Sequence, residues 1–455
     1  MPAEWTSLPL KDICTKIGSG ATPRGGDSVY LSDGEVSLIR SQNVYNNLFT
    51  KSGLVYLRNE NAAELQNVIV EKADVLLNIT GDSVARACQV PDDVLPARVN
   101  QHVAIIRPKP DIADSRFIRY NLVNPVMQAY MLQIASNGAT RNALTKGMIE
   151  SFQIPLPPLA EQKAIAHILG TLDDKIELSR KMNETLEAMA RALFKSWFVD
   201  FDPVRKKQAG QPTGLPSEID ALFPGEFEDS ALGEVPKGWW VGTIGDVADI
   251  VGGSTPSTSN PKFWVDGNHA WITPKDLSSA NSIILMSSER KITDLGLKEI
   301  TSGLLPQGSL VLSSRAPIGY LAINDMPVAI NQGFIGMKPK PPFTSFFLLN
   351  WLKLNMSEVL SRANGSTFLE ISKSNFRPIP FLIPPHSILN TFSQHTDPIL
   401  SRLRNLAVQT RSLSVSRDTL LPKLISGELR VPGLSSPEGR IEGKDAERFV
   451  GGANV

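Results

Sequence analysis

Two carboxylates and a lysine have the types and the spacing that could support catalysis. Asp276 is followed by Glu289 and Lys291, in the style of Asp…Glu-x-Lys metal sites. Such a set can hold Mg²⁺ and activate a water molecule for hydrolysis. Because a Glu-x-Lys triplet often arises by chance, we favour a solvated surface for these three side chains. A sequence-specific, metal-dependent nuclease remains the alternative function.

Other catalytic signatures in the sequence are incomplete. Lys340-Pro341-Pro342-Phe343 is similar to the Asn/Asp-Pro-Pro-Phe/Tyr motif of amino-methyltransferases, but lysine has no acceptor for the adenine amino group. Gly18-Ser19-Gly20 lacks the third glycine of a dinucleotide-binding loop, and the sequence has no Walker A motif. The five histidines are not spaced as metal ligands. These observations favour a binding protein that carries no metal or cofactor over an enzyme.

The elements that position the polar residues occur in two copies. The matching segments are residues 17–23 with 250–256, Asn100-Gln101 with Asn331-Gln332, residues 137–140 with 364–367, and Lys146 with Lys373. Matches in the same order along two halves of a chain indicate a tandem duplication of a domain of about 150 residues. The sequence therefore predicts an α+β protein with two repeated mixed α/β domains, over residues 1–158 and 239–385.

Each copy ends in a proline-rich run that is followed by a heptad pattern. The pattern predicts long helices over 159–201 and 386–430, each with a narrow apolar seam. At 1.5 Å per residue such a helix would be about 60 Å long, which exceeds the width of one domain. We therefore expect an antiparallel coiled-coil pair with one domain at each end. The alternative is two independent amphipathic helices, each packed on its own domain.

Two further segments are rich in proline and glycine. Residues 202–238 are predicted to be an extended connector between the first long helix and the second domain. Residues 431–455 are predicted to be a disordered tail.

Composition narrows the class of partner. The chain has 46 Lys+Arg and 46 Asp+Glu, which argues against a histone-like protein or a protein with a basic arm but does not exclude DNA. With only Cys14 and Cys88, a disulfide framework is not expected. The first ten residues lack the apolar core of a signal peptide, and no apolar run approaches the ~20 residues that span a bilayer. We expect a cytoplasmic protein that does not bind membranes.

Several segments together carry a family resemblance. They are residues 17–23, Asn100-Gln101-His102, residues 137–144, and the run Ile154-Pro155-Leu156-Pro157-Pro158-Leu159-Ala160-Glu161-Gln162 at the start of a long helix. In these segments the chain resembles the DNA-specificity subunit of type I restriction-modification systems, over roughly residues 4 to 430. The second copy departs from the pattern, because Pro384-Pro385-His386-Ser387 lacks the Glu-Gln pair.

The resemblance implies a non-catalytic subunit with two target recognition domains, each of which reads one half of a bipartite target in double-stranded DNA. The paired helices would set the spacer and dock two modification (methyltransferase) subunits, which bring S-adenosylmethionine and methylate adenine. Restriction subunits, which use ATP and Mg²⁺, would join this core. A duplicated adaptor that binds only proteins through its heptad helices is a further alternative.

The duplication also sorts the candidate DNA contacts. Positions that are kept in both copies cannot distinguish two different half-sites, so we interpret Asn100-Gln101 as framework, and Lys146 and Lys373 as phosphate contacts. Base contacts are expected where the copies differ but stay polar, because Arg can pair with guanine and Asn or Gln with adenine. The candidates are Arg40, Gln42, Asn43, Asn46, Arg86 and Arg141 in the first copy, and Lys275, Arg315 and Tyr320 in the second. For each, a solvated surface role is the alternative.

Overall fold

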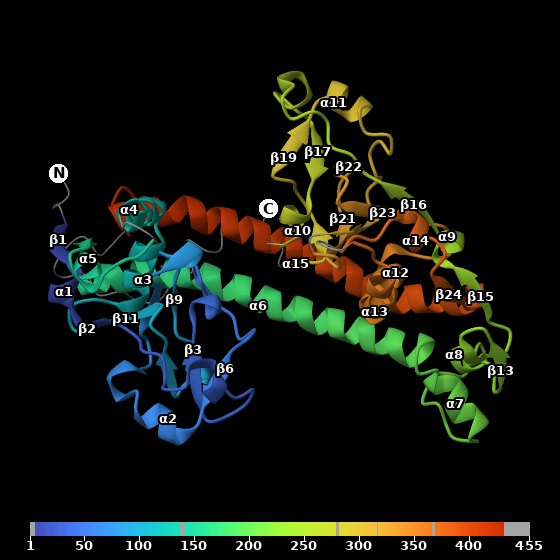
Figure 1. The fold of residues 1–455 in the computed structure, drawn as a ribbon, viewed down its shortest axis with the longest axis horizontal. Helices are drawn as coiled ribbons and strands as arrows, with labels where there is room; N and C mark the ends of the chain where they lie inside the picture. Colours follow the sequence, from blue (N-terminus) through green and yellow to red (C-terminus); the bar gives the residue numbers. More distant parts are fainter. Residues whose placement is uncertain (1–4, 137–141, 279–281, 316, 366–368, 432–455) are drawn as a thin grey trace. The chain divides into compact units, whose positions relative to one another are not determined.

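The structure, a computed structural model, describes residues 5–136, 142–278, 282–315, 317–365 and 369–431. Contacts within the chain divide it into two compact units, whose elements Figure 1 labels and colours along the sequence. Unit 1 comprises Met1–Ile176 and Ser412–Val455, and unit 2 comprises Glu177–Arg411. Unit 2 is therefore continuous in sequence, whereas unit 1 is built from both ends of the chain.

The described part of unit 1 holds two four-stranded sheets and two strand pairs. One sheet has the order β2-β11-β8-β9 and is antiparallel. The other has the order β6-β3-β10-β7, in which β3 and β10 are parallel. The remaining pairs are β1-β12 and β4-β5. The strands are β1 (Thr6–Pro9), β2 (Cys14–Ser19), β3 (Val36–Ile39), β4 (Val44–Tyr45), β5 (Leu48–Phe49), β6 (Val55–Leu57), β7 (Ile69–Val70), β8 (Val75–Asn78), β9 (Ala87–Gln89), β10 (Ala97–Val99), β11 (Val103–Pro108) and β12 (Gln153–Leu156).

Unit 1 also contains short helices. They are α1 (Leu10–Ile13), α2 (Asn59–Ala63), α3 (Ser115–Val123), α4 (Pro125–Ser136) and α5 (Lys146–Glu150). Helix α3 begins where the Asp114 carboxylate accepts a hydrogen bond from the Phe117 backbone N–H at 3.0 Å. Its buried residues Phe117, Ile118 and Leu122 join the core formed by β2, β8 and β11. The burial of α3 fixes the strands from which the candidate loops extend.

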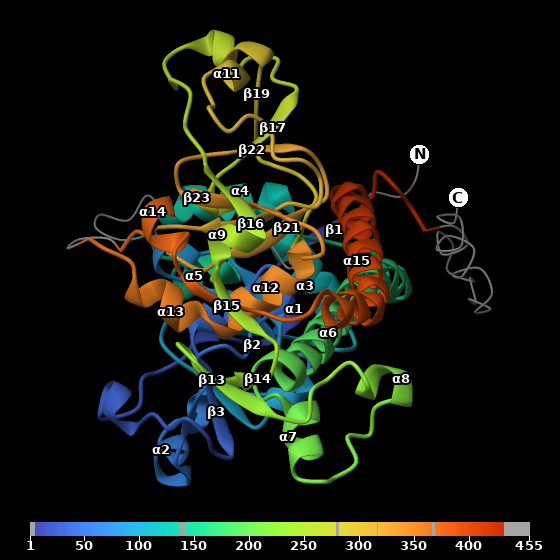
Figure 2. The ribbon, with the colours of Figure 1, turned by 90° about the vertical axis from the view of Figure 1, so that its right-hand side faces the viewer.

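Unit 2 repeats this plan. Its larger sheet has the order β16-β23-β20-β21-β18, its smaller sheet has the order β19-β17-β22, and β15 pairs with β24. The strands are β15 (Trp240–Thr243), β16 (Ala248–Gly252), β17 (His269–Ile272), β18 (Ile284–Leu285), β19 (Arg290–Ile292), β20 (Leu310–Ser313), β21 (Leu321–Asn324), β22 (Val328–Ile330), β23 (Phe334–Pro339) and β24 (Pro380–Ile383). The domain's helices are α9 (Ile244–Val247), α10 (Pro274–Ser278), α11 (Asp294–Lys298), α12 (Ser345–Leu354), α13 (Met356–Ser361) and α14 (Lys373–Phe376). Figures 1 and 2 both show the smaller sheet and α11 at the end of this domain that is farthest from α12 and α13.

The two domains have the same strand register at equivalent positions. In the first, Ile17 of β2 pairs with Ile106 of β11, and in the second, Ile250 of β16 pairs with Met337 of β23. The glycines at the ends of the matching sequence runs meet the same close approach. A Cβ on Gly20 would lie 1.9 Å from the Val99 carbonyl oxygen, and one on Gly253 would lie 1.9 Å from the carbonyl oxygen of Ile330, so only glycine fits either place. The predicted duplication of a mixed α/β domain is confirmed.

Two long helices, α6 (Leu159–Phe198) and α15 (His386–Ser426), each contribute to both units. In unit 1 the beginning of α6, with Ile165 and Leu169, shares a core with Leu424 near the end of α15. In unit 2 the end of α6 packs against the beginning of α15, and the Phe194 and Phe392 ring centroids lie 5.8 Å apart. The helices therefore run antiparallel, as predicted. The alternative of two independent helices is wrong, because each domain packs against parts of both.

The Glu-Gln pair at the start of α6 makes buried polar contacts in unit 1. The Glu161 carboxylate is fully buried and accepts hydrogen bonds from Arg430 Nε at 2.7 Å and Nη2 at 2.9 Å. Gln162 is also buried; its Nε2 donates to the Ile112 carbonyl at 3.0 Å and its Oε1 accepts from the Asp114 N–H at 3.0 Å. The pair therefore joins α6 both to its own domain and to the segment that follows α15.

In the second domain, the residues at the places of this Glu-Gln pair are apolar. Ile388 and Leu389 follow Pro384-Pro385 by the same spacing as Glu161-Gln162 follow Pro157-Pro158. Both are buried in the core of unit 2, which also contains Val204 from the segment after α6. The departure from the family pattern in the second copy is thus a replacement of a polar contact by an apolar one.

The prediction of an extended connector over 202–238 is wrong. The segment forms α7 (Asp202–Gln208), α8 (Ser217–Asp220) and a hairpin of β13 (Phe227–Ser230) with β14 (Gly233–Pro236). Val204 and Phe223 are buried in the core of unit 2, so the segment gains enough apolar burial to fold despite its prolines and glycines. Apart from Val431, the predicted tail lies outside the described residues. Within the described ranges, no helix is long and apolar enough to cross a membrane.

Candidate nucleic-acid interface

The polar residues that match between the two copies form the same framework in each domain. The Thr22 hydroxyl donates to Gln101 Oε1, and the Thr255 hydroxyl donates to Gln332 Oε1. The neighbouring asparagines close a turn: the Asn100 side-chain oxygen accepts from the His102 N–H at 3.1 Å, and that of Asn331 accepts from the N–H of Gly333 at 2.9 Å. The predicted framework role of Asn100-Gln101 is consistent with these contacts.

A pair of loops beside this framework also repeats. In unit 1 a bridge joins Thr80, after β8, to Ala143, before α5. In unit 2 the equivalent bridge joins Arg315, after β20, to Glu370, before α14. Each bridge therefore joins two segments that are far apart in the sequence, and it does so at equivalent places in the two domains.

The two lysines at the ends of these loops are exposed. Lys146 is the first residue of α5, and its Nζ lies 3.5 Å from Glu150. Lys373 is the first residue of α14, and its side chain extends over Gly252 of β16. Their equivalent places suit contacts of one kind in both domains, as phosphate contacts would require.

The first group of candidates in unit 1 surrounds the turn after β3. Arg40 Nη2 and Gln42 Nε2 both donate to the Gly53 carbonyl, at 2.6 and 3.1 Å. Asn43 has no exposed surface, and its amide is fully engaged with the Arg40 N–H and with the carbonyls of Thr50 and Ser52. Asn43 therefore holds the turn together and cannot read a base, which corrects its place among the candidates.

The second group lies beside β9. Asn46 is exposed; its side-chain oxygen accepts from the Ala87 N–H at 3.1 Å, and its Nδ2 donates to Gln128 at 3.3 Å. The guanidinium of Arg86 lies 4.8 Å from the centroid of the Tyr45 ring. These contacts bring Asn46 and Arg86 to one place on the domain. Arg141 lies outside the described residues.

In unit 2 the acidic residues of the proposed nuclease site have other partners. Asp276 Oδ2 accepts from both the N–H and the hydroxyl of Thr273, at 2.8 and 2.9 Å, and Oδ1 accepts from the Glu289 N–H. Lys275 Nζ lies 2.9 Å from the Glu289 carboxylate, and their hydrogen bond raises the pKa of Lys275. Asp276 thus fixes the start of α10, and no group of potential metal ligands occurs among the residues that the structure covers.

The other two candidates of unit 2 lie on the repeated loops. Arg315 Nη1 is 3.6 Å from the Glu370 carboxylate, so it is held to the neighbouring loop. Tyr320 is half-buried and follows the turn after β20. Its carbonyl accepts from Ser313 just as the Arg86 carbonyl accepts from Asn78, both at 2.8 Å. Tyr320 therefore takes the place of Arg86 in the repeat.

One further arginine of unit 2 has an unusual environment that the sequence pattern does not single out. Arg290 of β19 is exposed, and its guanidinium lies 3.6 Å from the centroid of the Trp264 ring. The signal was a pair of tryptophans, Trp264 and Trp271, in a segment that the first copy fills with other residues. The pairing of Arg290 with Trp271 depends on strand register, which a sequence pattern does not supply.

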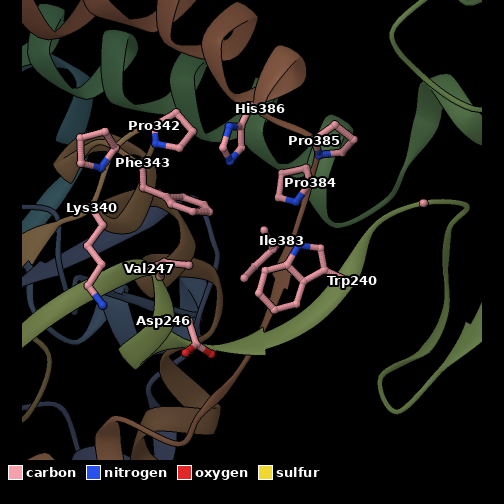
Figure 3. A pocket seen from close by; sticks show the side chains of 12 residues that line it. Trp240, Asp246, Val247, Lys340, Pro342, Phe343, Ile383, Pro384, Pro385 and His386 are labelled. Carbon is pink, nitrogen blue, oxygen red and sulfur yellow. The ribbon is translucent and has the colours of Figure 1, made fainter.

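A pocket of about 320 Å³ lies where β15, β24 and the start of α15 meet in unit 2. Figure 3 shows the Trp240 ring beside Ile383, with Lys340, Pro342 and Phe343 on the opposite side. Lys340 Nζ donates to the Gly245 carbonyl at 2.9 Å. The Lys-Pro-Pro-Phe run is thus one wall of a proline-rich pocket, and its lysine offers no acceptor to an adenine.

Comparisons with known proteins all relate the chain to specificity subunits of type I restriction-modification systems. The family described as "Type I restriction modification DNA specificity domain" matches residues 2–188 and 236–409. The chain is 27% identical to the HindI specificity subunit of Haemophilus influenzae, over 79% of this chain and 87% of that protein. It is 26% identical to the MjaIX specificity subunit of Methanocaldococcus jannaschii, over 95% of both. A crystal structure of the type I S subunit from M. genitalium has the same fold, with a TM-score of 0.53 at 14% identity, over 92% of this chain and 96% of that one.

Proposed function

The chain belongs to the family of type I restriction-modification DNA-specificity subunits, and we propose that each of its two domains reads one half of a bipartite target in double-stranded DNA. As a specificity subunit, it is a recognition component and not the catalyst. It binds DNA and assembles with other subunits of its system.

The observation that supports a bipartite target is the repeated framework with different polar loops. Both domains have the Thr–Gln hydrogen bond, the asparagine turn and a lysine at the first position of the helix that follows the second loop. The loops that these features support carry different residues: Arg86 has Tyr320 at its place, and Thr80 has Arg315. Phosphate contacts position a protein without conveying sequence, whereas contacts to base edges specify it. One framework with two sets of loops is what a pair of unlike half-sites requires.

We assign the long helices to spacing and to partner docking. Leu178 and Met189 of α6 and Val408 of α15 are at least half exposed, although they are large and apolar. Exposed apolar side chains mark a protein-binding surface where they form a patch, and we propose that these three contribute to one. The proposed partners are two adenine-methyltransferase subunits that supply S-adenosylmethionine, joined by restriction subunits that use ATP and Mg²⁺. Because the DNA that such a complex modifies is in the cytoplasm, we expect the chain there.

The test is a domain exchange within the assembled complex. The chain would be co-expressed with methyltransferase subunits, and methylated adenines would be mapped on a genome or on a random duplex library. The expected result is one motif with two constant parts separated by a spacer of fixed length. Replacement of residues 239–385 by the equivalent domain of a relative should change one part only. A single continuous motif, or a change in both parts, would refute the assignment.

A further inference from the structure

Two arginines differ from all the others that the structure describes. Arg86 in unit 1 and Arg290 in unit 2 each lie against an aromatic ring, and within the described residues neither guanidinium has a hydrogen bond or an ion pair. The other ring-bound arginines also donate to an oxygen; Arg40 donates to Gly53 and Arg119 to Asp173, for example. Each domain thus holds one such guanidinium over an aromatic ring, and among the described residues its N–H groups have no hydrogen-bond partner.

Arg290 is held by two fixed tryptophans. Its guanidinium lies 3.6 Å from the Trp264 centroid and 5.4 Å from that of Trp271. The two rings meet edge to face at 5.0 Å. Each indole N–H also donates to the backbone of one loop, Trp264 to the Ser257 carbonyl at 2.9 Å and Trp271 to that of Ser254 at 3.2 Å. The support for the guanidinium is therefore anchored before any ligand arrives.

Arg86 is held in a similar way by Tyr45, an exposed residue. Its backbone is fixed at both ends: the Arg86 N–H donates to Ser83 at 3.2 Å, and the Arg86 carbonyl accepts from the Asn78 N–H at 2.8 Å. Tyr45 belongs to β4, which pairs with β5. The backbone of both Arg86 and Tyr45 is therefore held by hydrogen bonds.

The two arginines occupy different places in the repeat. Arg290 pairs across β19 and β17 with Trp271, whereas the equivalent strands of unit 1 place Val55 opposite Leu38. The place of Arg86 is taken in unit 2 by Tyr320. Because the arginine held over a ring lies at different positions in two copies of one fold, the framework does not require it. Such arginines would contact different positions of two unlike half-sites.

We propose that Arg86 and Arg290 each read a guanine, in the first and second half-sites respectively. The inference rests on the proposed function. A guanidinium edge matches the O6 and N7 acceptors of guanine in the major groove, and a pair of such bonds discriminates that base from the other three. Stacking on an aromatic face restricts the side chain while it keeps this edge free. Lysine cannot replace it, because an ammonium lacks both the planar fork and the stacking face.

The test uses the full chain assembled with its methyltransferase subunits and a pool of random DNA duplexes, from which bound duplexes are sequenced. The wild-type complex should select two constant half-sites. Arg290→Ala should abolish the preference for guanine at one position of the second half-site and weaken binding to the wild-type target by roughly 5- to 150-fold. Arg86→Ala should do the same in the first half-site only. Arg290→Lys should not restore the guanine preference.

Arg362→Ala is the matched control in unit 2, because Arg362 is paired with Glu358 at 2.7 Å; it should leave the selected motif unchanged. The assignment is overturned if the alanine variants keep the wild-type motif, or if they weaken binding equally on all sequences, since the latter result identifies a phosphate contact. It is also overturned if lysine restores the guanine preference, because the planar guanidinium would then not be what reads the base. If the wild-type complex selects no half-sites, the proposed function itself fails, which is a distinguishable result.

Discussion

The buried ion pair between Glu161 and Arg430 offers a sharp test of how unit 1 is held together. Glu161 has no exposed side-chain surface, whereas 22% of the Arg430 side chain is exposed. Arg430→Met leaves a carboxylate buried without its partner. Glu161→Gln leaves an arginine that can turn toward water. The two variants break the same contact but should have unequal costs.

The magnitude follows from the burial of each partner. Removal of one member of a buried pair typically costs about 3–5 kcal/mol, and because Arg430 is partly exposed we expect about 3 kcal/mol for Arg430→Met. Loss of a hydrogen bond to a charged group costs about 1.5–3 kcal/mol, and solvation of the freed arginine offsets part of that for Glu161→Gln. The double variant Glu161→Ile with Arg430→Met should lie within about 1 kcal/mol of wild type, since apolar replacements of buried pairs are often neutral. Ile388 already occupies the equivalent buried place in unit 2.

Hydrogen–deuterium exchange of peptides from residues 412–430 and from the start of α6 would measure the opening of unit 1 directly. Lys423→Met is the control on the same segment, because Lys423 and Glu428 are 3.6 Å apart with both side chains about half exposed or more; it should change little. The reasoning fails if the double variant is as unstable as Arg430→Met, or if Glu161→Gln is the more damaging single change.

The other predictions concern DNA and chemical reactivity. Insertion of seven residues into both α6 and α15 should lengthen the spacer of the methylated motif and leave its constant parts alone; altered constant parts would refute the ruler role. Arg315→Ala should weaken cognate binding by about 1–3 kcal/mol and relax only the second half-site in a gel-shift series, whereas uniform weakening would make Arg315 a phosphate contact. The chain alone, with no net charge, should bind DNA weakly and lose binding as salt rises; nanomolar affinity at physiological salt would contradict this. Burial raises the pKa of the Cys14 and Cys88 thiols to about 12, so very little thiolate forms near pH 8, and a disulfide reagent should react with them mainly after unfolding.

The sequence predicted the features that depend on repetition and periodicity. The duplicated domain and the heptad helices could be found because each repeats its own signal, and Asn100 and Asn331 could be assigned to the framework because they match. Single contacts could not be found this way. Asn43 has the amide of a base reader, but its burial follows from carbonyls seven and nine residues away. Arg290 acquires its role from Trp271 on another strand, and that register is set only in the folded sheet.

Residues 202–238 are a segment for which the sequence predicted too little structure. Its prolines and glycines predicted an extended segment, and they do limit its helices to α7 and α8. The few apolar residues of the segment gave no helical period, yet Val204 and Phe223 pack in a core that is made by distant parts of unit 2. The free energy of burial against residues distant in the sequence overrides local composition. A short window of the sequence cannot show this contribution.

The two units differ in the contacts that join the ends of the long helices, and this difference bears on which helix ends can pair. Unit 2 is continuous, and its helix ends meet through apolar residues such as Phe194 and Phe392. Unit 1 must recruit residues 412–431 from the far end of the chain, at a higher cost in loop-closure entropy. The ends of both long helices are apolar, so hydrophobic burial alone would not distinguish one from the other. A bidentate pair between Glu161 and Arg430 does, because any other segment in that place would leave the carboxylate buried and unpaired. We infer that the charge pair serves to select the correct helix end, a hypothesis that predicts little loss of stability when both partners are replaced by apolar residues.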